Sequence, residues 1–158
     1  MQAPSGSLEW LSTNRLGSFA TGCADRRMRR KYHALLTVRE PGHGAPWNVL
    51  AELREVVNHA GHSGVLFDPL RELESSAELV GFDAGDEPRH RYRFVTGLCI
   101  ERAVRLASAH DQVEIRYRVE GVREPVELSL FPLLRCRPLH ELTHENPFLD
   151  GSIDWEGD

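Results

Sequence analysis

Apolar and polar residues alternate with a period of two along much of the chain. Residues 113–119 are the clearest case, because valine, isoleucine, tyrosine and valine take every second position with glutamate or arginine between them. Similar short apolar runs occur at residues 32–38, 49–57, 65–67, 92–94, 98–106 and 126–130. This alternation is typical of antiparallel strands that bury one face. Roughly seven such strands with turn residues between them predict an all-β fold, an antiparallel β-sandwich.

The connections between these runs add predictions about topology. Residues 121–125 form a short segment with a glycine and a proline between the runs at 113–119 and 126–130, which predicts that the two runs form a hairpin. No long segment repeats its apolar residues with the helical period, and only Arg71–Leu79 and Leu139–Glu145 are candidate short helices.

The length of 158 residues indicates a single domain over residues 1–158, or part of a larger structure. Residues 1–7 are small and polar, and residues 150–158 are acidic with two glycines, so we expect both ends to be flexible.

Charge and composition narrow the function classes. The net charge of −5 argues against a nucleic-acid partner, because such domains usually carry a strongly basic face. No apolar run is long enough to span a membrane, and the N-terminus lacks the pattern of a signal peptide. Three widely spaced cysteines suit free thiols in a reducing compartment. We therefore expect a cytoplasmic protein without a membrane partner.

His140-Glu141-Leu142-Thr143-His144 matches the H-E-x-x-H pattern of zinc hydrolases. In that chemistry two imidazoles one helical turn apart hold the metal, and the glutamate lies beside the metal-bound water. Pro138 and Pro147 leave room for only a very short helix, and no third ligand stands at a familiar spacing. The alternative is a single turn with two polar histidines.

Two other polar clusters have ordinary explanations. His59 and His62 lie in a Gly-containing turn, where solvated histidines are common. The basic run at residues 26–31 could contact an anion, but an isolated charge cluster is usually a solvated face. The cysteines show no CxxC spacing, and no dinucleotide, phosphate-loop or G-x-S-x-G motif occurs, so no cofactor is expected.

Residues 14–22 are rich in glycine and in neutral hydrogen-bonding side chains. Glycine allows the backbone to approach a ligand closely, and Asn, Ser and Thr suit sugar hydroxyls. Trp10, Phe19 and Tyr32 could offer apolar faces to a pyranose ring. The segment is therefore either a sugar-binding loop or an ordinary turn between strands.

Four motifs in order carry a resemblance to a known family. The sequence E-W-L-S-T-N-R-L-G-S-F-A-T-G at residues 9–22 resembles E-W-L-x-T-N-G-L-G-G-Y-A-S-G, the start of the N-terminal domain of bacterial and archaeal glycogen debranching enzymes, the amylo-α-1,6-glucosidases. R-R-K-Y-H-A-L-L at residues 29–36 is similar to the family's T-R-R-Y-H-G-L-L. Residues 132–137 and 142–146 match its P-L-L-x-x-R and L-T-x-E-N. Arg15, Ser18, Lys31 and Ala34 depart from the family pattern.

The resemblance implies a sandwich that is incomplete at its C-terminus, and the unpaired strand edge of such a sandwich favours a homo-oligomer. The same resemblance implies a β-sandwich packed on an (α/α)₆-barrel catalytic domain that carries the acid and base carboxylates. It predicts no catalytic residue and no metal in this chain, and a role in supporting the barrel and lining the cleft for glycogen or another α-glucan. The expected substrate-binding or domain-interface residues are Asn14, Gly17, Ser18, Arg30, Tyr32, His33, Thr143, Glu145 and Asn146. A stand-alone carbohydrate-binding module and a small zinc hydrolase that uses His140, Glu141 and His144 stay open as alternatives.

Overall fold

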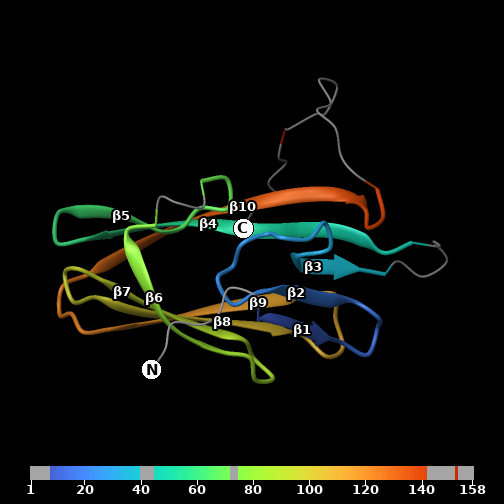
Figure 1. The fold of residues 1–158 in the computed structure, drawn as a ribbon, viewed down its shortest axis with the longest axis horizontal. Coiled ribbons are helices and arrows are strands. Elements are labelled where there is room, and N and C mark those ends of the chain that lie inside the picture. The colour runs from blue at the N-terminus through green and yellow to red at the C-terminus, as the bar shows by residue number, and fades with distance from the viewer. Residues whose placement is uncertain (1–7, 40–44, 72–74, 142–151, 153–158) are drawn as a thin grey trace, which may run out of the picture.

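Strands alone build the part of the chain that the computed structural model describes, residues 8–39, 45–71, 75–141 and 152. Within these residues two antiparallel sheets face one another, and no helix occurs (Figure 1). The predicted all-β sandwich is confirmed.

The larger sheet has the order β1-β2-β3-β4-β10, and β5 also pairs with β4. Its strands are β1 (Glu9–Thr13), β2 (Phe19–Cys23), β3 (Ala34–Val38), β4 (Trp47–His59), β5 (His62–Phe67) and β10 (Val126–Pro138). The smaller sheet has the order β6-β7-β8-β9. Its strands are β6 (Ala77–Asp83), β7 (Arg89–Phe94), β8 (Cys99–Leu106) and β9 (Val113–Glu120).

The core between the sheets is divided into two apolar clusters. One cluster contains Val57 of β4 and Ile100 of β8, and the other contains Leu53 of β4 and Val104 of β8. These residues follow the strand period of two, which turns every second side chain toward the facing sheet. Glu55 on β4 and Arg102 on β8 lie between the two clusters, and both side chains are fully buried.

The predicted hairpin of residues 113–119 with 126–130 is wrong. β9 pairs with β8 in the smaller sheet, whereas β10 pairs with β4 in the larger one. A connection of five residues reaches about 16 Å, which is enough to cross the roughly 10 Å between packed sheets. The alternating pattern indicates which face of a strand is buried but does not identify its neighbour, so the sequence could not separate the two arrangements.

The two candidate helices are not helical where the structure describes them. The described ends of the first, Arg71 and residues 75–79, contain no helix, and β6 begins at Ala77. In the second, residues 139–141 form a turn and bend, and the rest lies outside the described residues. The expected flexible ends, residues 1–7 and 150–158 apart from Ser152, also lie outside them. No helix in the described ranges is long and apolar enough to cross a membrane.

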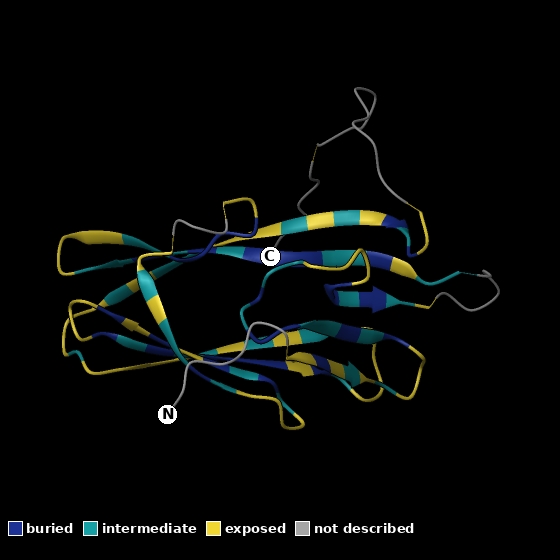
Figure 2. Cartoon of the chain, viewed as in Figure 1, coloured by how far each residue is buried: buried dark blue, intermediate teal, exposed yellow. Residues whose placement is uncertain are grey.

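β10 is the outer strand of the larger sheet and keeps much of its side-chain surface exposed. Figure 2 shows exposed and intermediate positions alternating along β10, beside a largely buried β4. Leu130 lies opposite Glu55 in the register and therefore shares its inward face, yet Leu130 is 44% exposed. Leu134 is 59% exposed and Phe131 is 47% exposed. Within the described residues β10 is the last strand of the larger sheet and has no paired strand on its outer side.

Candidate functional site

The loop of residues 24–33, between β2 and β3, begins with a tight turn that sends its first arginine inward. The main-chain NH of Arg26 donates to the carbonyl of Cys23 at 2.9 Å, and Arg26 has a φ of 60°. Arg26 is 3% exposed, and its guanidinium lies 4.1 Å from the centre of the Phe67 ring. The basic run predicted as a solvated face therefore contains one buried member.

Arg26 enters a four-residue ion network between the sheets. It donates to Glu55 at 2.5 Å and to Glu52 at 2.9 Å. Arg102 donates to the same two carboxylates, at 2.9 Å from Nε to Glu55 and at 3.0 Å from Nη2 to Glu52. The hydroxyl of Tyr117 on β9 donates to Glu55. Two positive and two negative charges thus balance inside the sandwich.

The charges in this network support one another. Burial disfavours the charged form of Glu55, but Arg26 and Arg102 outweigh burial and hold its pKa below the usual value. Burial and the charge of Glu55 raise the pKa of Tyr117. The hydroxyl therefore stays protonated and donates a hydrogen bond to Glu55. Because the carboxylates are paired and turned inward, the network serves to anchor the loop of residues 24–33 rather than to exchange protons with a ligand.

The far end of the same loop lies against the residues that follow β10. The ring of Tyr32 meets the ring of His140 edge-on with centres 5.9 Å apart, and the Lys31 ammonium lies 5.0 Å above the Tyr32 ring. Lys31 Nζ donates to the carbonyl of His140 at 3.1 Å. Arg137 donates to the carbonyl of Lys31 at 2.9 Å and also to that of Glu141. Tyr32 is 36% exposed, so part of its ring stays accessible.

Arg30 and His33, on either side of Tyr32 in the loop, belong to a compact group of ionisable side chains. Glu9 on β1 accepts a hydrogen bond from Nε of Arg30 at 2.6 Å, and this bond lowers the pKa of the Glu9 carboxyl. His33 Nε2 lies 3.8 Å from the same oxygen, and the sulfur of Cys23 lies 3.7 Å from His33 Nδ1. Burial lowers the pKa of His33 and raises the pKa of the Cys23 thiol, so both are held neutral.

The turn between β1 and β2 joins the two sheets. The side-chain oxygen of Asn14 accepts hydrogen bonds from the main-chain NH groups of Leu16 and Ser18, both at 2.9 Å. Asn14 Nδ2 donates to the carbonyl of His110 at 3.1 Å, and the Ser18 hydroxyl donates to Asp111 at 2.5 Å. His110 and Asp111 belong to the connection between β8 and β9. Gly17 adopts a φ of 90°, which L-residues rarely adopt.

A family model described as glycogen debranching enzyme N terminal matches residues 8–156. The chain belongs to the N-terminal family of glycogen debranching enzymes. No curated protein and no solved structure matches the chain. The resemblance that the four sequence motifs indicated is therefore confirmed.

The structure brings together some of the residues that this resemblance selected. Arg30, Tyr32 and His33 lie on one loop, and that loop contacts residues 137–141. Within the group, Arg30 and Tyr32 are exposed, whereas His33 is 3% exposed and cannot present its ring to a large ligand. Thr143, Glu145 and Asn146 lie outside the described residues. In the sequence they follow residues 137–141, which contact Tyr32 and its loop.

Asn14, Gly17 and Ser18 form a separate group. β2 separates their turn from the loop of residues 24–33, a distance of about 16 Å for a five-residue strand. Ser18 is fully buried, and the side chain of Asn14 is used by the turn and by the β8–β9 connection. Of the two readings of this segment, the described contacts fit the turn between strands.

The zinc-hydrolase pattern finds no helix in the described residues. His140 and Glu141 lie in the turn and bend at residues 139–141, where His140 packs against Tyr32. His144 lies outside the described residues.

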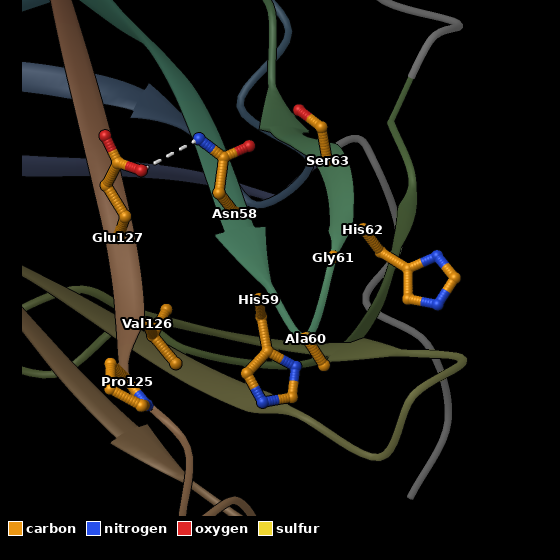
Figure 3. Close-up of a pocket in the computed structure, with 9 residues that line it drawn as sticks. All are labelled: Asn58, His59, Ala60, Gly61, His62, Ser63, Pro125, Val126 and Glu127. Carbon is orange, nitrogen blue, oxygen red and sulfur yellow. Dashed lines mark hydrogen bonds between the residues drawn. The ribbon is translucent and has the colours of Figure 1, made fainter.

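A hollow of about 510 Å³ lies at the C-terminal end of β4, between the tip of the β4–β5 hairpin and the start of β10. Figure 3 shows His59 and His62 at this tip with their rings pointing in different directions. Asn58 Nδ2 donates to Glu127 at 3.2 Å across the strand pair. The two histidines are the last residue of β4 and the first of β5, on either side of the turn at Ala60 and Gly61, and the ring nitrogens of His59 are buried rather than solvated. Their rings do not converge on a shared ligand.

Sequence reasoning missed the ion network completely. Its only signals were charged residues at positions where the strand period calls for apolar ones. Glu55 stands between Leu53 and Val57, and Arg102 stands between Ile100 and Val104.

Proposed function

We propose that this chain is the non-catalytic N-terminal domain of a glycogen debranching α-1,6-glucosidase, and that it supports the helical-barrel catalytic domain and helps to line the glucan cleft. The family membership supports the assignment of the parent enzyme as a glycogen debranching enzyme. The exposed apolar side chains along β10 support the docking role. We expect the protein to act in the cytoplasm, on glycogen or a related α-glucan.

The docking role follows from surface that the sandwich itself leaves uncovered. Leu130 and Leu134 are on the exposed outer strand of the larger sheet, and Val119 on the outer strand of the smaller sheet is 43% exposed. An outer strand with apolar side chains is prone to aggregation unless another element covers it. A rigid helical domain packed on this edge would bury these side chains, and each fully buried leucine contributes about 2 kcal/mol.

The cleft role follows from the surface around Tyr32. An accessible aromatic ring can pack on the C–H face of a pyranose, and Arg30 beside it can donate to sugar hydroxyls. Contacts from Lys31, Arg137 and His140 hold this surface in place. We propose Arg30 and Tyr32 as the glucan-contacting residues, and we assign His33, Asn14, Gly17 and Ser18 to supporting the fold.

The docking role is tested by mixing the chain with the helical catalytic domain of its parent enzyme. We expect the two to associate, and the debranching rate on a branched α-glucan to rise above that of the catalytic domain alone. Leu134→Asp should abolish both effects. Val95→Asp is the matched control, because Val95 is fully exposed on the β7–β8 turn. A catalytic domain that works equally well without the chain contradicts the proposal.

The same experiment separates docking from self-association. If the chain alone forms a dimer that Leu134→Asp dissociates, β10 is an interface between copies and the docking role is wrong. Titration with maltooligosaccharides tests the cleft role: Tyr32→Ala should reduce glucan affinity of the assembled enzyme, and Phe131→Ala should reduce it less. Tight binding by the chain alone would instead favour a stand-alone carbohydrate-binding module.

A further inference from the structure

Three side chains of metal-binding type converge where β1, β2 and the end of the loop of residues 24–33 meet. Glu9 and Cys23 lie directly opposite each other in the β1–β2 register, so their side chains leave the sheet on the same face. His33, the last residue before β3, reaches them from the loop. One ligand atom from each of the three residues lies within 4.8 Å of the other two.

We propose that Glu9, Cys23 and His33 form a binding site for a single zinc-like divalent cation. Thiolate, imidazole and carboxylate are the donors that proteins use for zinc. A thiolate and a carboxylate would supply two negative charges, which balance a divalent ion. With three protein ligands, the fourth position of a tetrahedral ion is open on the side of Glu9, whose side chain is 37% exposed.

The observed separations are close to those that a bound ion requires. Zinc–ligand bonds of 2.0 to 2.3 Å in a tetrahedral arrangement place neighbouring ligand atoms about 3.3 to 3.6 Å apart. Cys23 Sγ lies 3.9 Å from His33 Nε2, and His33 Nε2 lies 3.8 Å from Glu9 Oε1. Movements of about half an ångström close these two gaps. The third separation, from Cys23 to Glu9, is at most 4.8 Å, and rotation of the exposed Glu9 side chain would shorten it.

The surroundings of the three residues resemble the outer shell of a metal site. The main chain of Arg27 accepts a hydrogen bond from the imidazole of His33, which is the arrangement that orients a metal-binding histidine. Arg30 fixes the Glu9 carboxylate through a hydrogen bond from Nε to Oε1, the same oxygen that lies 3.8 Å from His33 Nε2. Cys23 and His33 are 1% and 3% exposed, so the protein rather than solvent fixes their positions.

A nucleophilic Cys–His–Glu arrangement is the other chemistry that these residue types allow. It requires room for a substrate at the sulfur. Cys23 is 1% exposed, so its sulfur is covered. The three ligand atoms lie within 4.8 Å of one another, which suits a single ion rather than an acyl substrate. The geometry therefore favours the cation.

Titration of the full 158-residue chain with Co²⁺ tests the site, because cobalt bound to a thiolate gives a charge-transfer band in the near ultraviolet. We expect one Co²⁺ per chain with such a band. Cys23→Ser should remove the band, whereas Cys136→Ser, which removes an exposed thiol, should keep it. No band, or a band lost in Cys136→Ser and kept in Cys23→Ser, overturns the proposal.

A second measurement is independent of the buried cysteine. Glu9→Gln changes an exposed side chain and should preserve the fold, which circular dichroism checks. We expect it to weaken Zn²⁺ binding about tenfold or more in a chelator competition. The double variant His59→Ala, His62→Ala removes the histidines of the hairpin and should bind Zn²⁺ as the unmodified chain does. Zinc binding that is lost in this double variant and kept in Glu9→Gln identifies an adventitious ion only.

Discussion

Arg102 Nε donates to Glu55 Oε1 at 2.9 Å across the centre of the sandwich, and both side chains are fully buried. The pair stands between two apolar clusters, so each sheet contributes one charge where its strand period would place an apolar residue. Arg26 comes to the same position from the loop of residues 24–33. The fold of this loop, and with it the position of Tyr32, is therefore coupled to ionisation in the core.

Breaking this network should destabilise the chain strongly. Glu55→Gln keeps the volume of the side chain but removes the charge that Arg26 and Arg102 share. Loss of one partner from a buried ion pair costs about 3 to 5 kcal/mol in the free energy of unfolding. Urea unfolding followed by circular dichroism measures the change.

Glu101→Gln is the matched control for that substitution. Glu101 is the neighbour of Arg102 on β8, and its pair with Arg91, at 2.8 Å, is partly exposed on the outer face. An exposed pair contributes at most about 1 kcal/mol. If the two substitutions lower the unfolding free energy by the same amount, the network does not have the structural weight that we assign to it.

The sequence predicted the faces of the strands better than their neighbours. Alternation at residues 113–119 correctly identified the buried face of β9, yet the partner of this strand is β8 and not β10. Pairing depends on where the chain crosses between layers, and a short connection permits both a hairpin and a crossing. The same limit left residues 14–22 open between a binding loop and an ordinary turn, because the hydrogen bonds of this segment to His110 and Asp111 depend on a contact far away in the sequence.

Two sites escaped the sequence because they depend on tertiary contacts. Cys23 and His33 are ten residues apart, and only the β1–β2 register brings Glu9 to them. The ion network joins residues from a loop and from both sheets, and no local motif encodes such a set. The four family motifs did indicate the family that the family model confirms, and one of them contains Tyr32.

Stability should fall on mild acidification because of His90. Burial, together with the charges of Arg102 and Arg26, holds the pKa of His90 well below its usual 6.5. The unfolded chain therefore binds a proton near pH 6.5 that the folded chain does not. The resulting stabilisation is complete above this pH and is lost as the pH falls below it. One such group gives a slope of about 1.4 kcal/mol per pH unit in the unfolding free energy.

Urea unfolding at several pH values between about 7.5 and 5 measures this slope. His33 contributes in the same direction, since burial lowers its pKa as well. His90→Leu should reduce the slope by about 1.4 kcal/mol per pH unit, which is the contribution of one titrating group. Val95→Ala, which changes a fully exposed residue that does not titrate, should keep the slope of the unmodified chain. An unchanged slope in His90→Leu contradicts the assignment.

The crossing from β9 to β10 should depend on Gly121. This residue has a φ of 86°, and a Cβ atom there would lie 2.6 Å from the main-chain oxygen of Gly97. Gly121→Ala therefore combines a strained backbone with a clash against another turn. Gly61 separates the two effects, because its φ is 76° but a Cβ would meet nothing within 4 Å. We expect Gly61→Ala to cost about 1 to 2 kcal/mol in thermal or urea unfolding, and Gly121→Ala to cost clearly more. Equal losses would show that the close approach of the two turns is not maintained in solution.

Asn14 distinguishes a structural turn from a sugar-binding loop. Its side chain bonds to the main chain of Leu16 and Ser18 and to the β8–β9 connection at His110, so Asn14→Ala removes contacts that join the sheets. We expect a loss of about 1 to 3 kcal/mol in the unfolding free energy. Asn58→Ala, which removes one bond to Glu127, should cost less. Because the turn is about 16 Å from the loop that carries Tyr32, glucan affinity of the folded Asn14→Ala variant, measured by calorimetry in the assembled enzyme, should stay as it was. A stable Asn14→Ala protein with weakened glucan binding would show instead that this turn is part of a sugar-binding site.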